Sequence, residues 1–113
     1  MRPIDKYVEA MENKDFAGLA NLFTEDGVLC DYCSNSSSQR EYHIYGQAAI
    51  NMFFRNKFGF RQYSILGAEV VNEKQAEFIA NFGEGKLCQL VNQIHGNVAG
   101  KGYVLVAFLS LDI

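Results

Sequence analysis

Tyr7 is the first residue whose side chain and position together could support chemistry. It lies on an apolar helical stripe with Ile4, Val8 and Met11. A buried phenol needs a hydrogen-bond partner, and beside a cavity it can donate to a substrate oxygen that gains negative charge in the transition state. The alternative is a core tyrosine whose hydroxyl is satisfied locally. From the residues alone, the core tyrosine is the favoured interpretation.

Asp31 is the matching acid. It lies near the end of a short predicted strand, Val28 to Tyr32, on the face opposite Cys30 and Tyr32. At a pocket mouth, a carboxylate can take a proton next to a carbonyl and return it elsewhere, and partial desolvation raises the pKa of such a group towards the working range. The alternative is a strand-end aspartate that caps the following loop. The chemical role is the favoured hypothesis.

The elements that must position these residues change their periodicity along the chain. Pro3 and Asp15 suit the starts of two helices. A polar, Ser-rich loop is expected from Cys33 to Tyr42, and the stretch from His43 to Gly46 leads into a third helix. The third helix has the apolar stripe Ile50, Phe53, Phe54 and Phe58, and period-two strands are expected near 60–71, 74–83, 86–97 and 101–112. This order predicts one α+β domain over residues 1–113, with three N-terminal helices on a curved, mainly antiparallel sheet.

The composition excludes several classes of function. The chain has 113 residues, 49% of them hydrophobic, and a net charge of −3. Its ten Lys and Arg form no basic stripe, so nucleic acid is not an expected partner, and the acidic balance disfavours an anionic membrane surface. No signal peptide or membrane-spanning run is expected, which makes the cytoplasm the predicted location.

Several segments of the first half together resemble a known superfamily. They are Tyr7-Val8-Glu9-Ala10-Met11, Asp15, Leu22-Phe23-Thr24-Glu25-Asp26-Gly27-Val28, Asp31, Tyr45-Gly46-Gln47-Ala48-Ala49-Ile50 and Phe53-Phe54. This pattern, over roughly residues 4–58, is similar to the nuclear transport factor 2-like superfamily, in its SnoaL-like and ketosteroid-isomerase-like branch. The resemblance implies a cone with a pocket open at one end, a pocket tyrosine at Tyr7 and a proton-transferring aspartate at Asp31. The mechanism of those isomerases, in which one acid moves the proton while other groups hold the oxygen, is implied by the resemblance as well.

The chain departs from that pattern at two places. Ketosteroid isomerases carry a protonated aspartate on a late strand, where the best register here places Asn92. Asn92 shares a strand face with Cys88, Leu90 and Ile94, and its amide donates at any pH. The alternative is an asparagine that pairs with a sheet neighbour. The second departure is the long segment Cys33–Tyr45, which is expected to reshape the pocket mouth and argues against a steroid substrate.

Other side chains complete the predicted site. His43 ends the loop and could reach the mouth, where a His–Asp–Tyr pocket would resemble some dehydratases, but a surface loop histidine is the favoured interpretation. Phe54 and Phe58 are candidates for substrate contacts. Cys30 and Cys33 match Cys-x-x-Cys, but the cysteines are interpreted as reduced, small apolar residues, and no metal or cofactor is expected.

The resulting functional hypothesis is proton transfer, of isomerase or cyclase type, within a small apolar carbonyl compound. Asp31 is the predicted base, and Tyr7 and Asn92 polarise the oxygen. The rivals are a non-catalytic ligand-binding or dimerising module and the dehydratase. The segment from Tyr103 to Leu111 is apolar on both strand faces, which predicts either a homodimer through the sheet or a covering helix.

Overall fold

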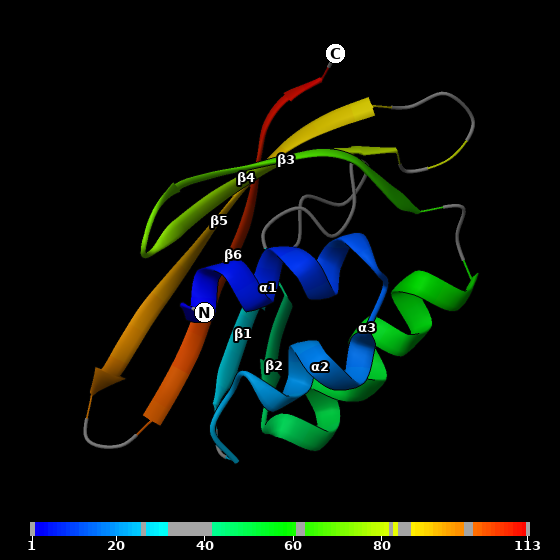
Figure 1. The fold of residues 1–113 in the computed structure, drawn as a ribbon. Coiled ribbons are helices and arrows are strands. Elements are labelled where there is room, and N and C mark those ends of the chain that lie inside the picture. Colours follow the sequence, from blue (N-terminus) through cyan, green and yellow to red (C-terminus); the bar gives the residue numbers. More distant parts are fainter. Residues whose placement is uncertain are drawn as a thin grey trace.

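The computed structural model describes residues 2–25, 27–31, 42–60, 63–81, 83, 87–98 and 101–112, with backbone only at Asp31, Tyr42, Phe60, Cys88, 94–98 and 101–112. The helices are α1 (Pro3–Glu12), α2 (Phe16–Asn21) and α3 (Gln47–Phe60). The strands are β1 (Val28–Asp31), β2 (Tyr42–Tyr45), β3 (Ser64–Asn72), β4 (Gln75–Asn81), β5 (Leu87–Val98) and β6 (Lys101–Asp112). The helices lie on one side of a curved sheet (Figure 1). The predicted α+β class is confirmed.

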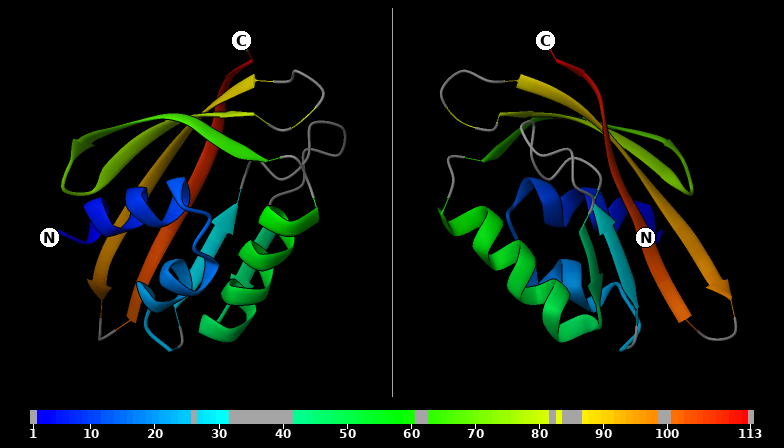
Figure 2. Two further views of the ribbon diagram at one scale, coloured as in Figure 1. Left: turned by 45° about the vertical axis from the view of Figure 1, so that its right-hand side comes forward. Right: turned by 180° about the vertical axis from the view of Figure 1, so that it is seen from behind.

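The six strands form one sheet in the order β2-β1-β6-β5-β4-β3. All neighbours are antiparallel except β1 and β6, which run parallel. The β3–β4 and β4–β5 pairs and the long β5–β6 pair make the predicted four-stranded meander. Register shifts interrupt the β3–β4 and β5–β6 ladders. Such bulges bend a strand and increase its twist, and Figure 2 shows the sheet curling around α1.

One prediction about the chain between the second and third helices was wrong. The stretch from Tyr42 to Tyr45 is not a lead-in to α3 but the edge strand β2, paired with β1 from Val28↔Tyr45 to Asp31↔Tyr42. Its tyrosines and isoleucine favour strands, and four residues are too few to show a period against the polar segment before them. The rest of the predicted loop lies outside the described residues.

Hydrogen bonds fix how the first two helices meet. At the end of α1, the Lys14 N–H donates to the Met11 carbonyl and the Asp15 N–H to the Ala10 carbonyl, at 3.3 and 2.8 Å. Lys14 has a φ of 55°, the left-handed conformation that this helix-ending motif requires. The Asp15 side chain then accepts from the Gly18 N–H at 2.9 Å and caps α2, as predicted.

The start of α3 is tied to the turn that precedes β1. The Gly46 N–H donates to the Gly27 carbonyl at 2.7 Å, and the Gln47 N–H donates to the Glu25 carbonyl at 3.0 Å. The Gln47 side-chain amide donates to the Phe23 carbonyl at 2.9 Å. Gly46 has a φ of +91°, a backbone conformation that is strained for any residue with a side chain. These bonds hold α3 against the layer that covers the sheet.

The core lies between the helices and the concave face of the sheet. On β4, buried and half-buried residues alternate strictly, and Ala76, Phe78 and Ala80 face the helices. Helix α1 packs against β3 and β4, and α2 packs against α3. Among the side chains that the structure describes, the buried apolar residues are Ile4, Tyr7, Ala10, Met11, Leu19, Ala20, Phe23, Leu29, Ile50, Phe54, Phe58, Tyr63, Ala76, Phe78, Ala80 and Leu90. Against this background a buried polar side chain needs a reason.

The convex face of β4 and β5 carries a row of amides around one carboxylate. Gln75 and Gln89 each donate to the Glu77 carboxylate at 3.2 Å. Gln93 donates to the Gln75 side-chain oxygen, also at 3.2 Å. All four side chains are half-buried. Polar groups on this face therefore bond to one another.

Candidate functional site

Tyr7 projects from the middle of α1 onto the concave face of the sheet. Its ring is 1% exposed and makes an edge-to-face contact with Phe78, with ring centroids 6.1 Å apart. Its hydroxyl donates to the Asn92 side-chain oxygen at 2.7 Å. Both the burial and the need for a hydrogen-bond partner expected from the sequence are present.

Asn92 comes from the centre of β5 and is 2% exposed. It shares the concave face with Leu90, as the predicted register requires, and is opposite Ala76 on β4. The Ala76 side chain is small and fully buried. The Asn92 Nδ2 atom is buried and has no hydrogen-bond partner within the described part of the chain. The alternative of an asparagine paired only with a sheet neighbour is not what the structure shows, because its partner comes from α1.

A register shift lies beside Asn92. Val91 pairs with Phe108 and Gln93 with Leu105, so β6 carries one extra residue opposite Asn92. A bulge of this kind often lies next to a functional site, where it redirects a side chain. The amide is therefore held between a helix on one side and an irregular stretch of the ladder on the other.

The Tyr7–Asn92 pair is rich in hydrogen-bond donors. One O–H is used within the pair, and the amide retains two N–H groups on Nδ2. A buried donor without a partner costs about 1–3 kcal/mol. A carbonyl oxygen is the simplest group that would accept from it. Since both side chains are almost fully covered, a ligand could reach them only after neighbouring side chains moved aside.

Asp31 is the last residue of β1, and its backbone pairs with that of Tyr42. It follows Leu29, which is buried, by two residues. The Asp31 side chain lies outside the described part of the structure. Its role as a general base stays a prediction.

The His43 side chain is exposed on β2. Its Nδ1 atom is 3.7 Å from the Cys30 Sγ atom, in the cross-strand pair Cys30↔His43, and its ring stacks on Tyr45. The structure thus does not bring His43 together with Tyr7 and Asn92. Cys33 lies outside the described residues, so the Cys-x-x-Cys interpretation stays untested. The described residues contain no group of three His, Cys, Asp or Glu side chains that could hold a metal ion.

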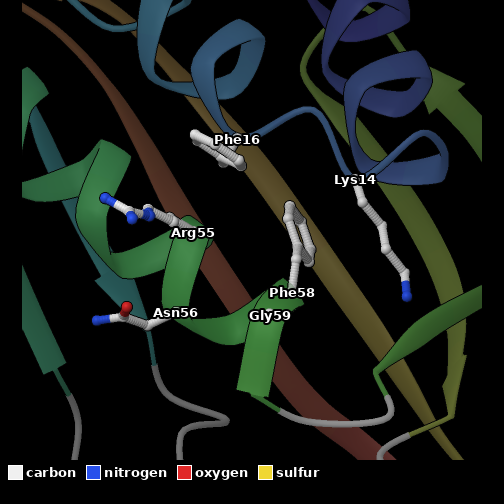
Figure 3. A pocket seen from close by; sticks show the side chains of 6 residues that line it. All are labelled: Lys14, Phe16, Arg55, Asn56, Phe58 and Gly59. Atoms are coloured by element: carbon white, nitrogen blue, oxygen red, sulfur yellow. The ribbon is translucent and has the colours of Figure 1, made fainter.

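Phe54 and Phe58 are both buried on the inner side of α3 and stack with centroids 5.7 Å apart. Phe58 also packs against Tyr63 at 5.8 Å. Phe58 has a second surface, which lines a pocket of about 410 Å³ between α2 and α3. The pocket is lined by Lys14, Phe16, Arg55, Asn56, Phe58 and Gly59 (Figure 3). Tyr7 and Asn92 are not among its lining residues.

Two features of the site were missed from the sequence. Phe78 and Ala76 lie next to Tyr7 and Asn92, and the strict alternation of 75–81 could have assigned them to the concave face. The pocket between α2 and α3 has no signal in the sequence, because it depends on how the two helices pack.

No described helix has the length and apolar character needed to cross a bilayer.

Comparison with solved structures establishes the fold. A proposed polyketide cyclase from Pseudomonas putida matches with a TM-score of 0.62 at 13% identity, covering 94% of this chain and 88% of that protein. A computationally designed 17-OHP binder matches with a TM-score of 0.59 at 14% identity, covering 96% and 94%. The orange carotenoid protein of Anabaena (Nostoc), in complex with canthaxanthin, matches with a TM-score of 0.62 at 23% identity over 96% of this chain and 36% of its own.

These likenesses confirm the cone-shaped fold that the first half of the sequence predicted, and at such identities they show the fold alone. A scan against protein-family models gave no match, and neither did a search among curated proteins.

Proposed function

We propose that this protein binds a small, mostly apolar carbonyl compound inside the cone, with Tyr7 and Asn92 holding the carbonyl oxygen. The observation that carries the proposal is the buried Nδ2 atom of Asn92, which has no partner among the described residues. A ligand oxygen would satisfy that donor, while Leu90 on the same strand face and Phe78 beside Tyr7 would cover an apolar body.

Two structural neighbours are named for the compounds they bind. One was designed to bind 17-OHP, and the other is an orange carotenoid protein that binds canthaxanthin. These names support small-molecule binding by proteins of this fold. The extension to this chain rests on its own buried donor rather than on the likeness.

Within this proposal, the finer hypothesis is proton transfer of the ketosteroid-isomerase-like or SnoaL-like type. Donation from the Tyr7–Asn92 pair would stabilise the negative charge that develops on the carbonyl oxygen. Asp31 would take a proton from the carbon next to the carbonyl and return it to another carbon of the same compound. The product would then be an isomer of the substrate. Where the carbanion instead attacks a second carbonyl and closes a ring, the proton would go from Asp31 to the oxygen of that carbonyl.

A matched pair of ligands tests the binding step. β-Ionone is an apolar enone, and β-ionol differs from it by an alcohol in place of the ketone. We expect β-ionone to shift the side-chain amide signals of Asn92 in a nitrogen–proton NMR spectrum and β-ionol to bind more weakly. Asn92→Leu should weaken β-ionone binding, by about ten-fold for one lost hydrogen bond to a buried group. Gln93→Leu, on the other face of the same strand, is the control. Equal binding of ketone and alcohol would contradict the assigned role of the pair.

A second experiment separates catalysis from binding. Conversion of 3-cyclohexen-1-one into 2-cyclohexen-1-one moves one proton from the carbon next to the carbonyl to a remote carbon, and it is followed by ultraviolet absorbance. We expect Asp31→Asn to abolish this conversion and leave β-ionone binding intact, with Asp5→Asn as the control. Unchanged turnover in Asp31→Asn would exclude Asp31 as the base.

The second candidate function is non-catalytic binding. The observation that favours it is the mutual hydrogen bond of Tyr7 and Asn92, which already uses the phenolic hydrogen. Binding of β-ionone without any conversion of cyclohexenone by the wild-type protein would support this candidate.

We further propose a homodimer formed through the sheet, because the sequence from Tyr103 to Leu111 is apolar on both strand faces. The polar row on β4 and β5 would then flank the apolar contact. Native mass spectrometry gives the oligomeric state directly, and a monomer at micromolar concentration would contradict this part of the proposal.

A further inference from the structure

The pocket between α2 and α3 has a composition unlike that of the cone interior. Two of its lining residues are cations, Lys14 from the turn after α1 and Arg55 from α3. None of its lining residues is acidic. The nearest acid in the sequence, Asp15, directs its carboxylate to the Gly18 N–H at the start of α2. The pocket is therefore electropositive.

The floor of the pocket is aromatic. Phe16 is 36% exposed on one side of the pocket, and Phe58 closes the other side. Figure 3 shows the two rings projecting into the space between the helices, with the Arg55 and Lys14 side chains on opposite sides of them. A flat ring placed here would meet two phenylalanine faces or edges.

The two cations differ in how they are held. Arg55 extends from a regular turn of α3, and its planar guanidinium can bind a carboxylate through two parallel hydrogen bonds. Lys14 is held in the left-handed conformation by the two hydrogen bonds that end α1. Glycine is the usual residue at that position, so the lysine is kept at a cost in backbone strain.

We propose that this pocket binds a small aromatic carboxylate, with the ring between Phe16 and Phe58 and the carboxylate on Arg55, while Lys14 on the opposite side adds to the positive potential of the pocket. Its volume of about 410 Å³ suits a ligand of one or two rings. The site is separate from the Tyr7–Asn92 pair and does not depend on the function proposed for that pair.

The probe is 2-naphthoate, and 2-naphthamide is its neutral control of the same shape. We expect 2-naphthoate to shift the backbone amide signals of residues 14–18 and 55–59, with a Kd on the order of 1 mM, as is usual for the efficiency of small ligands. The shifts should weaken as salt is added, because the recognised charges are exposed. Binding of 2-naphthamide should be several-fold weaker.

Three variants separate ligand contacts from structural effects. Arg55→Gln should weaken 2-naphthoate binding by about five-fold, the upper range for an exposed charge pair. Lys14→Gly should also weaken it, yet raise the Tm by about 4 °C because the backbone strain is relieved. Lys74→Gln removes an exposed cation in the β3–β4 turn and should change neither.

Three results would each overturn the proposal. One is the absence of shifts at residues 14–18 and 55–59 with 2-naphthoate at several millimolar. Another is equal affinity for 2-naphthoate and 2-naphthamide. The third is the same loss of affinity in Lys74→Gln as in Arg55→Gln. Failure at this pocket would leave the β-ionone result at Asn92 unaffected, so the two sites are tested independently.

Discussion

The two faces of strands β4 and β5 treat polar side chains in opposite ways. On the convex face, Gln75, Glu77, Gln89 and Gln93 are half-buried and hydrogen-bonded to one another. On the concave face, Asn92 is the buried polar residue; it has one short bond to Tyr7 and a donor with no partner within the described chain. A polar row that satisfies itself has no need of a ligand. Asn92, in contrast, lies in an apolar core with a hydrogen-bond partner for its oxygen but none for its Nδ2 within the described chain, and a ligand could supply that partner. The concave face is therefore the better candidate site.

Asn92→Asp should break this contrast most strongly. Burial raises the pKa of the introduced carboxyl above its unfolded value, and the Tyr7 hydroxyl offsets this only in part. Below the unfolded pKa, near 4, the carboxyl is protonated in both states and the stability of the fold is unaffected. As the pH rises above that value, the unfolded state loses the proton more readily than the folded state, so the stability of the fold decreases. Urea unfolding of Asn92→Asp should therefore show a loss of about 3 kcal/mol between pH 4 and pH 7 that the wild type lacks. A pH-independent difference would mean that the site is hydrated.

Tyr7→Phe should have the next largest effect. It removes the donor to the Asn92 oxygen and leaves a second amide group unsatisfied, so the free energy of unfolding should fall by about 2 kcal/mol. Tyr45→Phe is the matched control, because its ring is 68% exposed, and it should stay within about 0.5 kcal/mol of wild type. Chemical denaturation measures both. A loss of equal size in the two variants would contradict the importance of the buried bond.

Adding Asn92→Leu to Tyr7→Phe should sharpen the comparison. The double variant replaces both polar partners by apolar groups, so it should recover about 1 kcal/mol relative to Tyr7→Phe alone. A double-mutant cycle by urea unfolding gives the coupling. Strict additivity of the two single losses would mean that Tyr7 and Asn92 do not act as a pair.

Glu77→Gln should have the smallest effect. The convex row is half-buried and can bond to water, and the single oxygen of an introduced amide still accepts from one of the two neighbours. The expected change in unfolding free energy is about 0.5 kcal/mol. A loss as large as that of Tyr7→Phe would remove the difference between the two faces.

The parts of the fold with a strong period could be predicted from the sequence. The stripe of α1, the Asp15 cap and the alternation along β4 and β5 are local patterns, and they assigned Leu90 and Asn92 to one face correctly. The edge strand β2 could not be predicted in the same way. Its four residues become a strand because β1 lies beside them, which is a tertiary effect.

The candidate site was predictable only as a set of residues. The resemblance predicted that Tyr7 and Asn92 act on one oxygen, but it did not predict their mutual hydrogen bond. That bond joins positions 85 residues apart and depends on a register that slips beside Asn92 itself. The Lys14 and Arg55 pocket depends on helix packing, for which no motif exists. The distance between these groups comes from the tertiary structure alone.

The placement of β6 has a consequence for how the chain is made. β6 follows the other five strands of the sheet in the sequence but lies between β1 and β5, and its parallel pairing with β1 joins the two parts of the sheet (Figure 1). A nascent chain that ends before residue 101 can form the β3–β5 meander and the β1–β2 hairpin, but no strand connects them. Long-range pairing of this kind slows folding and leaves strand edges open meanwhile. Completion of the sheet should therefore depend on the twelve-residue strand β6, and on whatever shields the open strand edges until β6 has been synthesised.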